Sequence, residues 1–422
     1  MTDLSTPGGL PDHAQLPIEF RCQTCGRLLS INRSAAGQSV KCPDCNGVMR
    51  APGLGENQRL DSTEPARIEA TPAAARSDAA AVLSSDGQPA KNAEASQVQS
   101  PPSARVRRTK ELYDRVVEQI RKIYIGQDEL VEGTLCALFS GGHVLIESVP
   151  GLGKTLLVCA LGKVLGCKFG RIQFTADLMP SDLTGAPIFN MKSQDFEFRA
   201  GPVFTQLLLA DEINRSPAKT HAALLEIMQE YQVTVDRVRH KIERPFLVMA
   251  TQNPIESEGT YNLPEAQLDR FMFKIVAEYP SEPEEAAVLK MHRAQIDLQK
   301  HLEANIEVVT NPEEILQVTD HCRETIVDDR LLDYINSLVR LTRVWPQFHM
   351  GASPRAGISL LHGARTLAAF RGRDYAVPDD VVDIALPALR HRVMLTAEAE
   401  VEGHDVDELL RNLMRSVEVP RL

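Results

Sequence analysis

The chain has 422 residues, of which 43% are hydrophobic and 24% charged, and its formal net charge is −11. This length predicts two to three domains. The acidic balance argues against extended binding to nucleic acid, which depends on neutralising phosphates. No apolar run is long enough to span a bilayer, and Met1 to Pro7 show no secretion signal. The sequence therefore predicts a cytoplasmic protein with reduced thiols and no membrane segment.

Four of the eight cysteines form two Cys-x-x-Cys pairs within residues 17–50: Cys22, Cys25, Cys42 and Cys45. This spacing favours one Zn²⁺ ion held by four thiolates, and the cytoplasmic setting weighs against disulfides. A site closed by four cysteines is structural rather than catalytic, so we expect a zinc-ribbon-like interaction module. The remaining cysteines lie in apolar contexts and are expected to be small core residues.

Residues 51–105 are rich in Ala, Ser, Pro and Gln and contain no aromatic residue. Such a segment buries too little apolar surface to offset the loss of chain entropy, so we predict a disordered linker. Continuous apolar runs follow, ending in strand candidates such as HVLIE, QLLLAD and FLVMAT, which indicate a parallel sheet covered on both faces. After residue 280 the strand signals stop, and helix starts appear at Asn311-Pro312, Ser353-Pro354 and Val377-Pro378. We therefore predict an α/β core over 106–280 and a helical lid domain over 281–422.

A glycine-rich loop follows the HVLIE strand and resembles the phosphate-binding pattern G-x-x-x-x-G-K-[ST]. Its residues are Ser148, Val149, Pro150, Gly151, Leu152, Gly153, Lys154 and Thr155. In this pattern the amides and the lysine bind the phosphates of ATP, and the threonine hydroxyl is a ligand of Mg²⁺. Ser148 stands where the pattern opens with glycine, at the strand end and further from the phosphates. A serine is tolerated there if its φ is negative.

Two polar strand ends are the expected partners of this loop. The QLLLAD strand ends in Asp211, and Glu212 follows; Asp211 would hold Mg²⁺ through water, and Glu212 would orient and deprotonate the attacking water. Asn253, after the FLVMAT strand, would orient that water. Alone, an Asp-Glu pair is often a helix cap and a strand-end asparagine is often turn chemistry. Their shared presence with the loop favours nucleotide hydrolysis.

The segments GGHVLIESVPGLGKT, LLLADEINRSPAKTHAALLEIMQE, ATQNPIESEGTYNLPEAQLDRFMFK and GASPRAG together resemble MoxR-type AAA+ ATPases. The resemblance runs from about residue 106 to the end and implies Walker A at the loop, Walker B at Asp211 and Glu212, and sensor 1 at Asn253. It further implies an arginine finger at Arg270 and a sensor 2 at Arg355. The alternative for Arg270 is a local ion pair. The stretch Ile125, Gly126 and Gln127 resembles the segment that lines the adenine pocket in this family.

The resemblance also implies a homo-oligomeric ring, usually a hexamer, that remodels a protein client with the energy of ATP. Partners with von Willebrand factor A domains and a role in maturation or metal insertion fit the same family. Two hairpins are expected, over 182–204 and 231–246, the second with basic residues near its tip: Arg237, Arg239, His240 and Lys241. They would face the pore and touch the client, or would be plain solvated turns. The alternatives are a nucleic-acid motor guided by the zinc module, which the acidic charge disfavours, and a nucleotide switch without hydrolysis, which Glu212 and Arg270 disfavour.

Overall fold

The computed structural model describes residues 18–21, 28–31, 38–41, 48–50, 103–149, 151–192, 194–253, 261, 263–293 and 298–421. The chain divides into two units, Met1–Glu94 and Ala95–Leu422. The first contains two antiparallel hairpins, formed by β1 (Ile18–Arg21) with β2 (Leu28–Ile31) and by β3 (Ser39–Lys41) with β4 (Val48–Arg50). The four clustered cysteines, and the predicted linker up to residue 102, lie outside the described residues.

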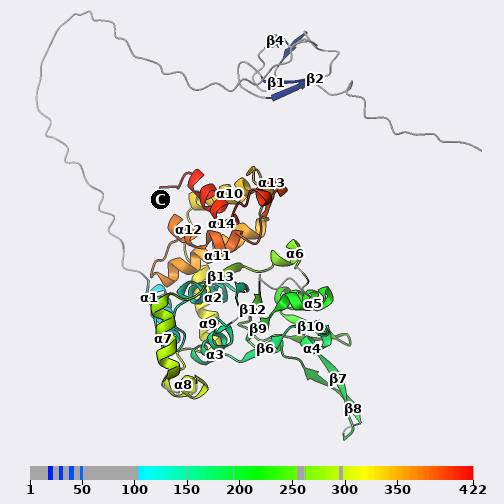
Figure 1. The fold of residues 1–422 in the computed structure, drawn as a ribbon, viewed down its shortest axis with the longest axis vertical. Helices are drawn as coiled ribbons and strands as arrows, with labels where there is room; N and C mark the ends of the chain where they lie inside the picture. Colours follow the sequence, from blue (N-terminus) through cyan, green and yellow to red (C-terminus); the bar gives the residue numbers. More distant parts are fainter. Residues whose placement is uncertain are drawn as a thin grey trace, which may run out of the picture. The chain divides into compact units, whose positions relative to one another are not determined.

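The second unit is built on a five-stranded parallel sheet in the order β13-β5-β12-β9-β6 (Figure 1). The strands are β5 (Val144–Ser148), β6 (Phe169–Gln173), β9 (Leu207–Asp211), β12 (Leu247–Gln252) and β13 (Phe273–Ala277). All five coincide with apolar runs predicted as strands. The predicted α/β fold with a parallel sheet is confirmed.

Both faces of the central strands β5, β12 and β9 are buried, as the uninterrupted apolar runs predict, whereas the edge strand β6 is largely exposed. Along β9, Leu207 and Leu209 pack into one hydrophobic cluster, whereas Leu208 and Ala210 pack into another on the opposite face. The first face is covered by α1 (Ala104–Arg121), α2 (Asp128–Ser140) and α3 (Lys154–Leu165), and the second by α5 (Ala218–Glu230).

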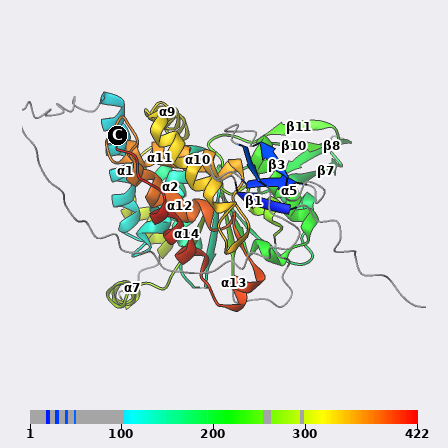
Figure 2. The same ribbon diagram turned by 90° about the horizontal axis from the view of Figure 1, so that it is seen from above.

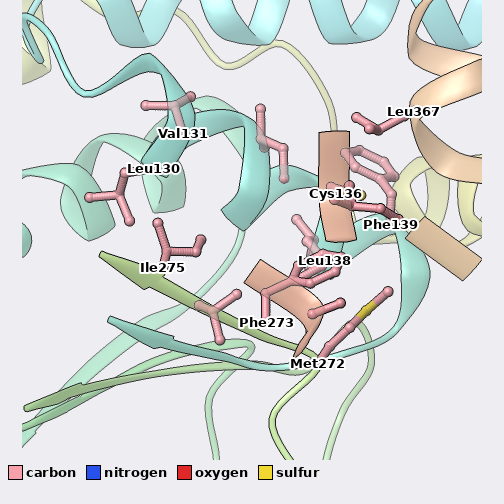
Figure 3. Close-up of a cluster of buried hydrophobic side chains, with 14 of the residues drawn as sticks. Leu130, Val131, Cys136, Leu138, Phe139, Met272, Phe273, Ile275 and Leu367 are labelled. Carbon is pink, nitrogen blue, oxygen red and sulfur yellow. The ribbon is translucent and has the colours of Figure 1, made fainter. Parts of the chain in front are cut away.

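Close packing of α2 on β13 fixes the edge of the sheet. Leu130, Leu138 and Phe139 of α2 lie over Phe273 and Ile275, as Figure 3 shows. A Cβ atom at Gly133 would come within 2.7 Å of the Ile275 side chain, so glycine permits this approach.

Helices form most of the region after residue 280, as predicted. They are α7 (Glu282–Arg293), α8 (Leu298–Asn305), α9 (Pro312–Arg323), α10 (Asp329–Thr342), α11 (Pro354–Phe370), α12 (Pro378–Leu389), α13 (Ala397–Val401) and α14 (Val406–Ser416). Asn311 caps α9 through its side chain, and α12 begins at Pro378. Two short strands, β14 (Phe348–Met350) and β15 (Met394–Leu395), also pair in this region. The prediction that strands end before it is wrong, because strands of two or three residues leave no periodic signal.

Both predicted hairpins are present. α4 (Pro180–Thr184) leads into the hairpin of β7 (Gly185–Asn190) and β8 (Asp195–Ala200), and β10 (Gln232–Val235) pairs with β11 (Val238–Lys241). Figures 1 and 2 show both hairpins together at one end of the second unit, away from α1. Arg237 and Asp236 form the β10–β11 turn with positive φ. His240, expected near a basic tip, instead stacks on Phe198 of the other hairpin with ring centroids 3.9 Å apart.

Among the described residues, no helix is both long and apolar enough to cross a membrane. The scattered cysteines are free thiols, of which Cys136, Cys167 and Cys322 are buried as predicted, whereas Cys159 is only half-buried.

His143 makes the stability of this unit pH-dependent. It is buried between the sheet and α5, where Val248 N–H donates to Nδ1 and Nε2 donates to the Met228 carbonyl. Burial lowers the pKa of His143 to about 4. The unfolded chain, with a histidine pKa near 6.5, then binds more protons below that value. Stability is full above about pH 6.5 and falls as the pH drops towards 4, by up to about 3 kcal/mol.

Denaturant titrations at pH 7.5, 6 and 5 measure this loss. The variant His143→Asn keeps an acceptor near Nδ1 but cannot titrate, so its stability should depend less steeply on pH. An equal slope in the two proteins would contradict the role of His143.

Candidate nucleotide site

The glycine-rich loop connects β5 to α3 at the carboxyl edge of the sheet. Gly151 and Gly153 have φ values of 91° and 71°, a region that favours glycine. α3 begins at Lys154, so the free amides of its first turn face the loop. Pro150 lies outside the described residues. The local geometry therefore has the features of a phosphate-binding loop.

Ser148 occupies the place of the first glycine without backbone strain, because it is the last residue of β5 and has extended geometry. Its side chain is buried, and its Oγ accepts a hydrogen bond of 2.9 Å from Lys154 Nζ. Burial lowers the pKa of Lys154, while Asp211 and Glu212 act in the opposite direction. The serine thus contacts the phosphate-binding lysine directly, which the loop pattern does not predict.

Tyr124, which follows α1, contacts the backbone of the glycine-rich loop. It is 5% exposed, and its hydroxyl donates a hydrogen bond of 3.1 Å to the Leu152 carbonyl. Burial raises the pKa of Tyr124 to about 12. The neighbouring stretch from Ile125 to Gln127 joins α1 to α2, and Gln127 Nε2 donates to the Glu278 carbonyl just after β13. The predicted adenine-pocket residues therefore lie at the same edge of the sheet as the loop.

The acid pair is fixed by one buried hydroxyl. Thr251 of β12, fully buried, donates to Asp211 Oδ1 at 2.7 Å, and its Oγ1 accepts the backbone N–H of Glu212 at 2.9 Å. Glu212 has a φ of 56°, which turns the chain out of β9. Asn253 immediately follows β12 and is 9% exposed. Because β12 lies between β5 and β9, Asn253 lies between the loop and the acids in the strand order.

Two side chains of β6, which the sequence reasoning missed, contact the acids. Arg171 Nη2 lies 2.8 Å from Asp211 Oδ2, and Gln173 Nε2 donates to Glu212 Oε2 at 2.6 Å. β6 pairs with β9 in a register that places Gln173 beside Asp211. The available signal was the alternation of Arg171 and Gln173 along β6, which places both side chains on one face of the strand.

Arg270 and Arg355 lie at the opposite, amino edge of the sheet. They line one pocket of about 230 Å³ together with Gly141, Gly142 and Arg392. Gly142 stands just before β5 and Ser148 ends it, so the five residues of the strand separate this pocket from the loop by roughly 16 Å. The structure brings the two arginines together but does not bring either to the phosphate loop of its own chain.

Asp269 organises this second cluster. Its carboxylate accepts hydrogen bonds from Ser353 Oγ at 2.9 Å and from Arg392 Nε at 2.8 Å, and Arg355 Nη1 lies 3.9 Å away. Ser353 also caps α11, accepting from Arg355 N–H. The Arg392 side chain, 2% exposed, additionally donates to the carbonyls of Phe271 and Met272. This network joins the chain around Arg270 to the helix that carries Arg355.

Comparisons with known proteins agree with this arrangement. Residues 143–273 match the family model "ATPase family associated with various cellular activities (AAA)", and residues 340–413 match an AAA lid domain. The crystal structure of a protein assigned as an ATPase from Cytophaga hutchinsonii is 39% identical and superimposes with a TM-score of 0.70, covering 75% of this chain and 97% of that one. The fold is therefore an AAA+ core followed by its lid domain.

Sequence relatives narrow the class. The chain is 44% identical to the uncharacterised protein YeaC of Bacillus subtilis, covering 73% of this chain and 95% of that protein. It is 41% identical to the chaperone MoxR1 of Mycobacterium tuberculosis, covering 73% and 82% respectively. The chain belongs to the MoxR-type AAA+ ATPases. It is an ATPase that uses ATP with Mg²⁺.

Proposed function

We propose that this ATPase forms a homo-oligomeric ring in which neighbouring subunits complete each nucleotide site, and that the ring remodels a protein client. The observation that carries the proposal is the separation of the two polar clusters on one sheet. The loop and acids occupy the carboxyl edge, whereas Arg270 and Arg355 occupy the amino edge. In a head-to-tail ring, one subunit's arginine edge meets the next subunit's nucleotide edge. A hexamer is the ring size that the family implies.

The hydrolysis step follows from the acid pair. Glu212 takes a proton from water as the water oxygen bonds to the γ-phosphorus of ATP and the bond to the bridging oxygen breaks. Thr251 holds the Glu212 amide and one Asp211 oxygen, so the positions of both acids are set by a buried contact. Asp211 and the Thr155 hydroxyl are the residues that would hold Mg²⁺, and the ion would supply positive charge to neutralise the phosphates. Asn253 orients the water.

We assign both arginines to the neighbouring subunit's site. The resemblance implied a sensor 2 role for Arg355, but Arg355 lines a pocket with Arg270 rather than lying beside its own loop. Two guanidinium groups supplied across the boundary would stabilise charge that develops on the transferred phosphoryl group. The Asp269 network connects the segment that carries Arg270 to the helix that carries Arg355.

The client class is supported by the β7–β8 hairpin. Its exposed side chains include Ile188, Phe189, Met191 and Phe196, and Phe189 packs edge-on against Phe196. An apolar projecting surface fits a protein client better than a phosphate backbone. This observation favours a remodelling chaperone over the nucleic-acid motor. Maturation or metal insertion as the task, and partners with von Willebrand factor A domains, rest on family membership alone.

The N-terminal unit is proposed to bind one Zn²⁺ ion. Cys22 and Cys25 fall in the connection between the paired strands β1 and β2, and Cys42 and Cys45 fall between β3 and β4. Each Cys-x-x-Cys pair therefore belongs to a hairpin connection, a placement that suits a four-thiolate site. We propose that this unit recruits a partner.

The variant Glu212→Gln should bind ATP as the unaltered protein does but hydrolyse it at least about 100-fold more slowly, because the base is lost. Steady-state phosphate release and equilibrium ATP binding measure the two properties. Glu243→Gln, which neutralises an exposed carboxylate paired with Lys168, is the control and should keep full activity. Turnover of Glu212→Gln at the rate of the control would remove its assignment as the base.

Arg270→Ala and Arg355→Ala should each be inactive alone, yet each should regain activity when mixed with Glu212→Gln. In a random one-to-one ring, roughly a quarter of the sites combine an intact acid with a neighbour's intact arginines. Phosphate release from mixed and unmixed samples tests this. Rescue of Arg270→Ala without rescue of Arg355→Ala would show that Arg355 serves its own subunit.

Purified protein should contain one zinc ion per chain, and Cys42→Ser should lose it while retaining ATP binding, because the nucleotide site belongs to the other unit. Metal analysis by mass spectrometry and nucleotide titration measure these two outcomes. Cys159→Ser, at a half-buried thiol outside the cluster, should keep its zinc. Zinc retained in Cys42→Ser would exclude the four-cysteine site.

A further inference from the structure

The guanidinium group of Arg171 forms an ion pair with Asp211, the carboxylate that is proposed to hold Mg²⁺. Of the two oxygens of Asp211, Oδ1 accepts the hydrogen bond of Thr251 and Oδ2 lies 2.8 Å from Arg171 Nη2. The Asp211 side chain is only 12% exposed, so its approach from solvent is narrow. A divalent cation that binds Oδ2 therefore meets a guanidinium group already in place.

The two side chains of this ion pair differ in how firmly the surrounding structure holds them. The Arg171 side chain is 46% exposed, whereas Asp211 is held by a buried hydroxyl. A half-exposed ion pair contributes little to folding stability and is readily exchanged for solvent. Arg171 can thus leave Asp211 without disturbing the sheet, while Asp211 stays where it is.

Arg171 is also linked to the second acid. The same Nη2 donates to Gln173 Oε1 at 3.0 Å, and Gln173 in turn donates to Glu212. Both acids are therefore occupied by partners from β6, and Lys154 is occupied by Ser148. Each charged group of the phosphate site has a partner within its own chain.

We propose that Arg171 is a positioning residue that occupies Asp211 until Mg²⁺ arrives with the nucleotide, and that the metal displaces it. This inference rests on the proposed role of Asp211 as a metal ligand. Its consequence is that the protein needs a higher Mg²⁺ concentration than the ligands alone would require, because the ion competes with a resident cation. Arg171 thereby sets the metal requirement of nucleotide binding.

The test is the Mg²⁺ dependence of equilibrium binding of a fluorescent ADP, with Mn²⁺ binding to the ADP complex followed by electron paramagnetic resonance. Arg171→Gln should lower the Mg²⁺ midpoint by about three- to tenfold, because the competing charge is gone. Arg171→Lys, which keeps the charge but loses the planar fork, should lie between the two. The Mn²⁺ affinity should rise in the same order.

Lys168→Gln is the matched control. Lys168 precedes the same strand and pairs with the exposed Glu243, so its loss removes one positive charge without touching Asp211. A midpoint in Arg171→Gln equal to that of Lys168→Gln would overturn the proposal. So would weaker ADP binding without metal at an unchanged midpoint, since Arg171 would then contact phosphate directly. If the unaltered protein bound no ADP at any Mg²⁺ concentration, the nucleotide site itself would be rejected, and the role of Arg171 with it.

Discussion

The parallel pairing of β5, β12 and β9 is the constraint on which the nucleotide site depends. It places the end of every strand at one edge, so that the loop after β5 and the acids after β9 face the same space. The buried Thr251 hydroxyl converts this rough proximity into fixed geometry, because one oxygen serves both the Asp211 carboxylate and the Glu212 amide. The turn at Glu212, where φ is positive, is held in addition by the Arg215 N–H, which donates to the Glu212 carbonyl at 2.9 Å, and by Gln173.

A second polar cluster holds the lid domain to the core. Asp269 belongs to the segment that leads into β13, whereas Ser353 and Arg392 belong to the helical region. Burial of the Arg392 guanidinium is offset by one carboxylate and several backbone carbonyls, which is how a buried charge is tolerated. Arg270 of the core and Arg355 of the lid therefore line one pocket, at the edge of the sheet opposite the loop.

Much of this was accessible from sequence. Apolar runs gave all five strands of the sheet, and proline preceded by a capping position gave the starts of α9, α11 and α12. The loop and acid pair were found because their residue types follow fixed chemical needs. The partners of these groups were not found. Arg171 and Tyr124 belong to no motif, and their contacts span 40 and 28 residues of sequence, so only the folded chain brings them to the site.

The placement of Arg355 shows a related limit. The Ser353-Pro354 signal correctly fixed the start of its helix, yet a local signal says nothing about which edge of a distant sheet that helix meets. The basic character of the β10–β11 hairpin was likewise visible in sequence, but the stacking of His240 on Phe198 was not. Side-chain contacts between segments that are distant in the sequence leave no periodic pattern, so only the folded structure shows them.

That stacking has a mechanical consequence. Since His240 and Phe198 tie the two projecting hairpins to each other, a load applied to one is shared by both. β10 follows directly from α5, and His221 of that helix donates to the carbonyl of Ile213, the residue after Glu212. The two hairpins are therefore connected, through α5 and one hydrogen bond, to the turn that carries Glu212.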